Sequence, residues 1–335
     1  MPSTAEFEVP VDDVVRLHAR LHISDHALSG PGGLAVASSS SSNNNSEKEG
    51  EPAALAVLLI CHGLLDTKHA PLFEHLQGSL PLATVAFDFR GNGLSTGTTT
   101  YGNYYAEADH IKHAVEFIND SASMAALTNS RPCRVQGILG HSKGGSSMFL
   151  FAYKYPMLCP PLLVNISARF WLARETPRRW SPDQLAELQT AGRFLWRTYG
   201  GKRVSRDLSS LATAAAESVE ADPGATTAIV PVREYWISSV DLQERCATDM
   251  SVVQALPHRC FILNIMGGAD RVVPEDDVWE YDRLIRLASC DPKRTTTSVV
   301  PGATHFWSSP SELSAVENVL KHWLDWVLPL TRSVV

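Results

Sequence analysis

The chain has 335 residues, a length that suits one α/β domain with an insertion. Hydrophobic residues make up 44% of it, so it can bury a sizeable core. Its 29 lysines and arginines face 36 acidic residues, which argues against nucleic acid or an anionic membrane as a general partner. A short basic cluster at residues 174–179 is interpreted as a solvated face.

Cysteine usage and the N-terminus bear on the compartment. The six cysteines show no paired spacing, and Cys61, Cys133 and Cys260 fall in apolar runs, as reduced core thiols do. Residues 1–12 contain no apolar signal-peptide region, and the longest apolar run, 53–61, is too short for a bilayer. We therefore expect a cytoplasmic protein without a membrane span.

The N-terminal part predicts two strands and a loop. Residues 7–10 and 14–23 indicate extended segments, and the second alternates apolar with polar residues at a period of two. Residues 29–52 contain a serine run and three consecutive asparagines, with almost nothing to bury. We expect a disordered low-complexity loop inserted between strands of a single domain, 1–335.

From residue 54 onward, short apolar runs alternate with longer amphipathic stretches. The runs are 54–61, 83–87, 135–139, 162–166, 261–265 and 298–300. The stretches are 71–80, 104–119, 144–155, 274–287 and 311–327. Apolar runs without alternation are typical of strands buried on both faces of a parallel sheet. The pattern predicts a doubly wound α/β fold whose function lies at the carboxyl ends of the strands.

Residues 170–245 break this rhythm. The segment is polar and helix-like, so we expect a small helical cap inserted over the site, although surface helices without a role in substrate choice would give the same pattern. The segment carries several aromatic residues: Phe170, Trp171, Phe194, Trp196 and Trp236. Packing of the cap on the core is the favoured interpretation of these side chains, ahead of direct contact with substrate.

Ser142 is the candidate nucleophile. It lies in Gly-His-Ser-Lys-Gly-Gly, directly after the apolar run 135–139 and directly before a helical stretch. This strand–turn–helix setting is that of a nucleophile elbow, in which the serine hydroxyl is raised above the sheet near helix N-terminal amides. The alternative is a serine that only caps the helix.

His305 is the candidate base. A serine hydroxyl needs a base to take its proton before it attacks. Of the twelve histidines, His305 follows the last apolar run in Pro-Gly-Ala-Thr-His-Phe, in a loop at the same edge of the sheet as Ser142. The alternative is a loop histidine in contact with water.

Asp270 is the candidate acid that orients the imidazole. It lies in Gly-Gly-Ala-Asp after the run 261–265, and the chain order serine, aspartate, histidine is the one expected for this fold. Asp276 and Asp277 are alternatives, but both fall within the helical stretch and would point away. Helix capping would also explain Asp270.

Two backbone amides are candidates for an oxyanion hole. Attack on an acyl carbon creates a negative oxygen that needs preplaced N–H donors. One donor is the amide of Lys143, directly after the serine, and the other is the amide of Leu64 in the loop after the run 54–61. The preceding Gly63 allows a backbone course that a side chain would obstruct.

These residues resemble the α/β-hydrolase superfamily, and within it the serine aminopeptidase-like and feruloyl-esterase-like group. The similar stretches are LLICHGLLDTKHAPLF, DFRGNGLS, ILGHSKGGSSMFLFAYKYP, NIMGGADRVVPEDD and VVPGATHFW. The resemblance implies a mostly parallel eight-stranded sheet with helices on both faces. It also implies a triad of Ser142, Asp270 and His305, an oxyanion hole at Leu64 and Lys143, and a structural role for 88–95.

The expected function is hydrolysis of a small-molecule carboxylic ester through an acyl-serine intermediate. A thioesterase, a peptidase or amidase, or an acyltransferase would use the same triad, and a weakly catalytic small-molecule receptor could use the same fold. We expect no metal, because no histidine–carboxylate cluster has ligand spacing, and no cofactor, because no phosphate-cradling loop occurs.

Overall fold

The computed structural model describes residues 3–29, 54–174, 179–201, 203–205, 227–289 and 291–331. The insertion predicted at 29–52 lies outside these residues except for Ser29, which ends the short helix α1 (Asp25–Ser29). No helix in these ranges is both long and apolar enough to cross a membrane. The predicted cytoplasmic location stays a prediction.

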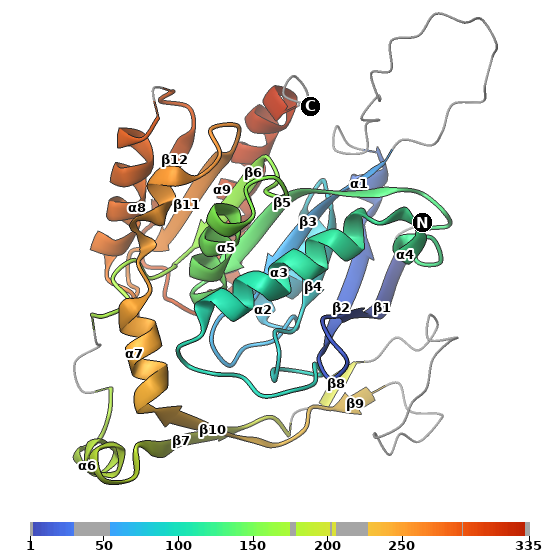
Figure 1. The fold of residues 1–335 in the computed structure, drawn as a ribbon. Coiled ribbons are helices and arrows are strands. Elements are labelled where there is room, and N and C mark those ends of the chain that lie inside the picture. Colours follow the sequence, from blue (N-terminus) through green and yellow to red (C-terminus); the bar gives the residue numbers. More distant parts are fainter. Residues whose placement is uncertain are drawn as a thin grey trace, which may run out of the picture.

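An eight-stranded sheet forms the centre of the molecule (Figure 1). Its strand order is β1-β2-β4-β3-β5-β6-β11-β12. β1 (Ser3–Pro10) runs antiparallel to β2 (Arg16–Ile23), which runs antiparallel to β4 (Ala83–Phe87). The other strands are parallel to β4: β3 (Leu55–Cys61), β5 (Cys133–His141), β6 (Leu162–Ile166), β11 (Phe261–Gly267) and β12 (Thr295–Val300). The predicted fold class is confirmed.

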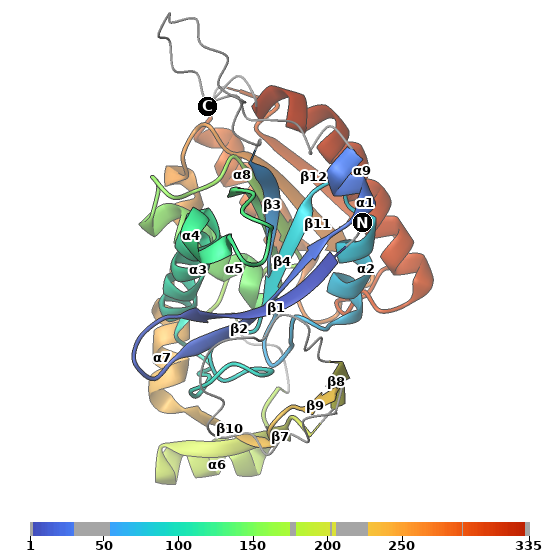
Figure 2. The same ribbon diagram turned by 90° about the vertical axis from the view of Figure 1, so that its right-hand side faces the viewer.

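Helices cover both faces of this sheet (Figure 2). α3 (Tyr104–Asn119), α5 (Lys143–Lys154) and α8 (Glu275–Leu287) pack on one face, and α2 (Pro71–Ser79) and α9 (Pro310–Thr331) on the other. Strand β3 shows why its sequence does not alternate: Val57 and Leu59 enter one core, while Leu58 and Ile60 enter the other. Both faces of the strand must therefore be apolar. The short helices α4 (Ser121–Met124) and η3 (Met250–Ala255) complete the main layers.

The segment between β6 and β11 does not have the purely helical structure predicted for it. Its described part contains α6 (Pro182–Ala191) and α7 (Ser239–Ala247), but also four strands: β7 (Arg193–Tyr199), β8 (Arg203–Ser205), β9 (Thr227–Ile229) and β10 (Arg233–Ser238). β7 pairs with β10 and β8 with β9, both antiparallel. The aromatic sequences of β7 and β10 suit a pleated surface. These two strands lie about 40 residues apart in the chain, so a local sequence pattern does not reveal their pairing.

The loop after β4 anchors this segment. Arg233 of β10 donates from Nη1 to the carbonyl oxygens of Gly91 and Gly93, at 2.9 and 3.2 Å, and from Nη2 to Ser95, at 2.9 Å. The Tyr199 hydroxyl of β7 donates to Gly91 at 2.7 Å. Because this loop leaves the carboxyl end of a parallel strand, the segment lies over the edge of the sheet where function is expected.

The anchoring loop is itself held by a buried ion pair. Lys68 Nζ donates to Asp88 Oδ2 at 2.6 Å, and both side chains are fully buried. The same Oδ2 accepts from the amide of Leu94 at 3.0 Å. At Gly93, where φ is +49°, a Cβ would lie 2.1 Å from Asp88 Oδ2, so only glycine fits. These contacts agree with the structural role expected for residues 88–95.

Candidate functional site

Ser142 lies on a sharp turn between β5 and α5. Its φ is 52°, a left-handed conformation that costs a non-glycine residue roughly 1–3 kcal/mol. Its amide donates to the carbonyl of Ile166 at 2.8 Å, which ties the turn to the neighbouring strand. A Cβ on Gly140 would lie 2.5 Å from the Gly144 carbonyl oxygen, so the glycines allow the chain to double back. The surrounding structure thus holds the serine in a strained and defined position.

The structure brings Ser142, His305 and Asp270 together. His305 Nε2 lies 3.0 Å from Ser142 Oγ, and His305 Nδ1 lies 2.7 Å from Asp270 Oδ2. Because a carboxylate only accepts hydrogen bonds, Nδ1 carries the proton and donates to it. Nε2 is then free to accept from the serine hydroxyl, which is the arrangement that a general base requires.

Asp270 is held as a carboxylate. Its side chain is fully buried, and its Oδ1 accepts from the amides of Val272 and Val273 at 2.7 and 2.9 Å. Burial raises the pKa of Asp270, but the hydrogen bond and charge of His305 and the two amides outweigh it, so the pKa lies below its ordinary value. The negative charge beside His305 therefore persists at neutral pH.

The two alternative carboxylates lie elsewhere. The Asp276 side chain is 78% exposed and lies 3.9 Å from Arg174. Asp277 Oδ2 accepts from the amide of Phe170 at 2.8 Å, so this buried carboxylate ties α8 to the segment after β6. Neither of them has a described contact with His305.

Glu312 fixes the loop that carries His305, a role that the sequence analysis missed. Its Oε1 accepts from the amide and the hydroxyl of Thr304 at 2.5 and 2.7 Å, and its Oε2 from the amides of Ser308 and Ser309 at 3.1 and 2.8 Å. Burial raises the pKa of Glu312, but these hydrogen bonds lower it to about 2. The signal was present: Ser309 and Glu312 have the spacing of a capping box at the start of α9.

His141 is a second contact that the sequence did not reveal. Its Nε2 lies 2.9 Å from the carbonyl oxygen of His305. Burial, and then the neighbouring His305, lower the pKa of His141 to about 3, so its ring is neutral. Since a carbonyl oxygen only accepts, Nε2 carries the proton and donates to it.

The loop with Leu64 passes directly beside the serine. A Cβ on Gly63 would lie 3.2 Å from the Cβ of Ser142. His62 Nε2 accepts from the amide of Phe89 at 2.8 Å, so its Nδ1 carries the proton and donates to the Gly63 carbonyl oxygen at 2.7 Å. The carbonyl of a trans peptide points opposite to its N–H, so the Leu64 amide is directed away from His62.

The Lys143 side chain points away from the serine hydroxyl. Its Nζ lies 2.8 Å from Glu107 Oε1, donates to the Thr100 carbonyl at 2.8 Å, and lies 5.0 Å from the Tyr104 ring centroid. These contacts hold the first residue of α5 against α3. Only the backbone amide of Lys143 is therefore left to act beside Ser142. In the described residues, no group of three His, Cys, Asp or Glu side chains could hold a metal ion.

A mostly parallel eight-stranded sheet, with a serine raised between β5 and α5 and a histidine after β12, defines an α/β-hydrolase. The chain belongs to the serine aminopeptidase family S33, whose model matches residues 52–307. This range contains Leu64, Ser142, Lys143, Asp270 and His305, and it includes the sequence stretches that resemble the α/β-hydrolase superfamily.

Curated and solved relatives agree with this assignment. The chain is 27% identical over 137 residues to a monoacylglycerol lipase of Mycolicibacterium smegmatis, a match that covers 40% of this chain and 42% of that protein. Est1E of Butyrivibrio proteoclasticus, solved with ferulic acid, aligns with a TM-score of 0.59 at 15% identity, over 95% of this chain and 97% of that one. An esterase of Pyrococcus furiosus aligns with a TM-score of 0.55 at 14% identity, over 97% and 92%. At such identities the structural likeness shows the fold.

Proposed function

We propose that the chain is a serine esterase that cleaves a carboxylic ester through an acyl-serine intermediate. The observation that carries this proposal is the unbroken line of hydrogen bonds from Ser142 through His305 to Asp270, at 3.0 and 2.7 Å. The S33 family and the similarity to a monoacylglycerol lipase and to esterases support hydrolysis of an ester bond.

In the proposed acylation step, Ser142 Oγ attacks the ester carbonyl carbon while its proton passes to His305 Nε2. The carbonyl π electrons move onto oxygen, and the amides of Leu64 and Lys143 donate to this oxyanion. Asp270 stabilises the positive imidazolium without taking its proton. The intermediate then collapses, the alkoxide leaves with the proton from His305, and the acyl group stays on Ser142.

In the proposed deacylation step, water takes the place of the alcohol. His305 Nε2 removes one proton from the water as its oxygen attacks the acyl carbon, and the same two amides hold the oxyanion. The bond to Ser142 Oγ breaks, and His305 returns its proton to the serine. The carboxylic acid leaves, and the enzyme regains its starting state.

We also propose that residues 170–245 act as a cap over this site. Tyr101, Phe194 and Tyr235 form a buried apolar cluster against which the side chains of Leu64 and Leu65 pack. The aromatic residues of the segment contact protein: Phe170 stacks edge-on to Tyr281, at 5.0 Å between ring centroids. These contacts support packing as the main role of these rings.

Peptidase activity is the second candidate, favoured by the name of the family. An aminopeptidase must bind a positive α-ammonium group beside the scissile bond, which calls for carboxylates near the site. The pocket in the proposed cap is instead lined by Arg174, Arg179 and Arg245, and no carboxylate lines it among the described residues. Positive charge there disfavours a free amino terminus, so we place ester hydrolysis first. Thioesters and acyl transfer would use the same steps with another leaving group or acceptor.

Labelling with a fluorophosphonate tests the proposal. The wild-type protein and Ser146→Ala, a change in α5 four residues after Ser142, should be labelled and should hydrolyse 4-nitrophenyl esters. Ser142→Ala should lose both properties. Labelling that persists in Ser142→Ala would refute the assigned nucleophile. Ligand binding by both wild type and Ser142→Ala, with no labelling of either, would indicate a receptor with this fold.

A further inference from the structure

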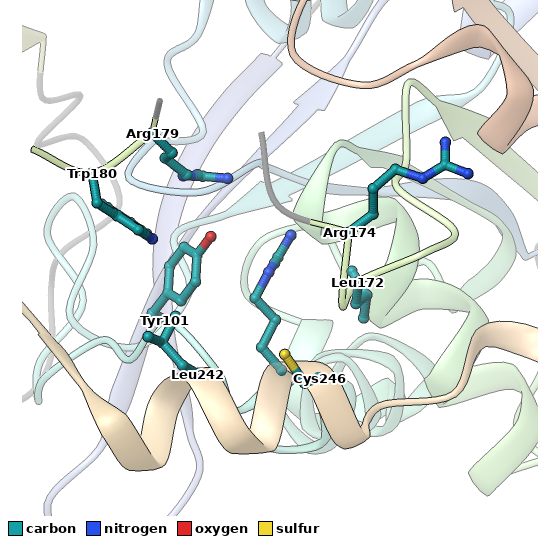
Figure 3. A pocket seen from close by; sticks show the side chains of 8 residues that line it. Tyr101, Leu172, Arg174, Arg179, Trp180, Leu242 and Cys246 are labelled. Carbon is teal, nitrogen blue, oxygen red and sulfur yellow. The ribbon is translucent and has the colours of Figure 1, made fainter. Parts of the chain in front are cut away.

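A pocket in the proposed cap carries an unusual excess of hydrogen-bond donors (Figure 3). Its polar lining includes Tyr101, Arg174, Arg179, Trp180 and Arg245. No carboxylate lines it among the described residues. Residues 174–179 were expected to form a solvated face, and residues 175–178 lie outside the described residues. The Arg179 side chain is partly buried against aromatic rings, so it is not a fully solvated charge.

Arg179 has no anionic partner in the described part of the chain. Its guanidinium carbon lies 5.2 Å from the ring centroid of Tyr101 and 5.3 Å from the rings of Trp180 and Trp196. Stacking leaves the edge of a guanidinium, with its N–H donors, available for other bonds. Burial lowers the pKa of Arg179, and the nearby charge of Arg245 lowers it further.

Arg245 of α7 supplies a second positive charge over the same ring. Its guanidinium carbon lies 4.9 Å from the Tyr101 centroid, and its Nη1 donates to the hydroxyl of Tyr104. The residue is only 8% exposed, and it forms no ion pair with a carboxylate of the described residues. Among the described residues, two arginines thus share one aromatic ring without a carboxylate to balance them, which is costly in a site shielded from water.

Arg174 differs from these two, although it lines the same pocket. It lies 3.6 Å from Asp277 and 3.9 Å from Asp276, and it stacks on Trp171 at 4.2 Å. Figure 3 shows its guanidinium directed away from the space between Arg179 and Tyr101. Its charge is therefore already balanced by protein carboxylates.

Trp180 adds an unused donor. Its indole nitrogen is buried and has no hydrogen-bond partner among the described residues, a state that buried polar groups rarely keep. In Figure 3 the side chains of Trp180 and Arg179 both extend toward that of Tyr101. A tryptophan N–H can only donate, so the missing partner is an acceptor.

Short contacts join the pocket to α3 and to the first residue of α5. Arg245 is bonded to Tyr104, whose ring lies 5.0 Å from the Nζ of Lys143, the residue after Ser142. Tyr101 belongs to the cluster against which Leu64 packs, beside the proposed oxyanion hole. These contacts place the pocket beside elements that flank the proposed oxyanion hole.

We propose that this pocket binds a compact oxyanion, a carboxylate or a phosphate, on the ester substrate, held by Arg179 and Arg245 with Trp180 as an additional donor. The inference rests on the proposed esterase function and names its substrate class: esters with a second, negatively charged group. Guanidinium forks match the geometry of carboxylate and phosphate oxygens, and an anion would relieve the repulsion between the two arginines.

Matched pairs of substrates test the proposal. One pair is the 4-nitrophenyl monoester of adipic acid and its methyl ester, with the carboxylate on the acyl side. The other pair is 4-acetoxybenzoate and its methyl ester, with the carboxylate on the alcohol side. A further substrate, 4-acetoxyphenyl phosphate, represents the esters that carry a phosphate. We expect kcat/KM to be about tenfold or more higher for an anionic ester than for its neutral twin. A preference on one side only would show which part of the substrate enters the pocket.

The ratio between the two members of a pair is then measured in Arg179→Gln and Arg174→Gln. The ratio should fall toward one in Arg179→Gln and stay high in Arg174→Gln, because Arg174 is paired with Asp276 and Asp277, whereas Arg179 has no carboxylate partner among the described residues. An equal fall in both variants, or no anionic preference in the wild type, would overturn the proposal.

Binding to Ser142→Ala separates this inference from the esterase proposal. Calorimetry should detect 4-acetoxybenzoate and not its methyl ester, whether or not the wild type turns over either of them. Binding without turnover would keep the anion site and remove the esterase function. Turnover of neutral esters, with no binding of an anionic ester and no preference for one, would keep the esterase function and remove the anion site.

Discussion

The residue before the candidate nucleophile holds the backbone of the candidate base: His141 Nε2 donates to the carbonyl oxygen of His305 at 2.9 Å. The elbow and the histidine loop are thereby fixed to each other independently of the bond between Ser142 and His305. We expect His141→Phe, which cannot donate, to lower kcat by roughly 5- to 10-fold with little change in KM. His141→Gln, which can donate, should recover part of the loss. Steady-state kinetics that show wild-type kcat in His141→Phe would contradict this positioning role.

Replacement of Asp270 should be far more damaging than replacement of Asp276. Asp270→Asn keeps the shape of the side chain but can place an amide against His305 Nδ1, which favours the wrong tautomer, and we expect kcat to fall roughly 10³- to 10⁴-fold. Asp276→Asn removes an exposed carboxylate six residues away and serves as the control, with kcat within about twofold of wild type. Similar rates for the two variants would remove Asp270 from the proposed triad.

The buried pair of Lys68 and Asp88 predicts a loss of stability in acid. Burial raises the pKa of Asp88, but the Lys68 charge lowers it to about 2, below its ordinary value of 3.8. A carboxyl group whose pKa is lower in the folded protein than in the unfolded chain stabilises the fold while it is ionised. The contribution of Asp88 is therefore complete above about pH 4, and it is lost as the pH falls through about 2.

Asp88→Asn checks this ion pair. Because it leaves a buried ammonium without its partner, it should cost about 3–5 kcal/mol in the free energy of unfolding at neutral pH. It should also flatten the pH dependence of stability between pH 4 and 2. The exposed Asp325→Asn is the control, and urea unfolding at several pH values is the measurement. If the free energy of unfolding of Asp88→Asn falls with pH as steeply as that of the wild type, other carboxylates cause the loss of stability in acid.

Glu312 should matter for both stability and rate, because four hydrogen bonds from the His305 loop end on its carboxylate. In Glu312→Gln one oxygen becomes an amide donor that faces other donors, so we expect a loss of about 1–3 kcal/mol in stability and a lower kcat. Glu317→Gln, in the same helix, removes only surface contacts with His75 and Lys321 and is the matched control. Thermal unfolding and esterase assays that do not separate the two variants would argue against the anchoring role.

Much of the fold could be predicted because its parallel strands are buried on both faces. The run at 83–87 and the stretch at 104–119 match β4 and α3 residue for residue. The ribbon of β7 and β10 could not be predicted in the same way, because its register, such as Phe194 opposite Ile237, depends on residues far apart in the chain. Its short strands also follow α6, whose capping box favours a helical interpretation of the whole segment.

The same difference between local patterns and tertiary contacts decides which parts of the candidate site could be predicted. Ser142, Asp270 and His305 could be proposed because each follows an apolar run, and parallel strands bring such positions to one edge. The contact of His141 with His305 and the stacking of two arginines on Tyr101 are tertiary contacts. No sequence spacing predicts them. Lys143 shows the difference within one residue: its amide was predicted from the motif, whereas its ion pair with Glu107 was not.

The most direct test is the mass of the protein during turnover. Rapid mixing with a 4-nitrophenyl ester, followed by acid quenching, should give a burst of nitrophenol equal to the protein concentration. Peptide mass spectrometry should then place one acyl group on Ser142, with no adduct in Ser142→Ala. An acyl group on a residue other than Ser142, or an equal burst and adduct in Ser142→Ala, would contradict the acyl-serine account.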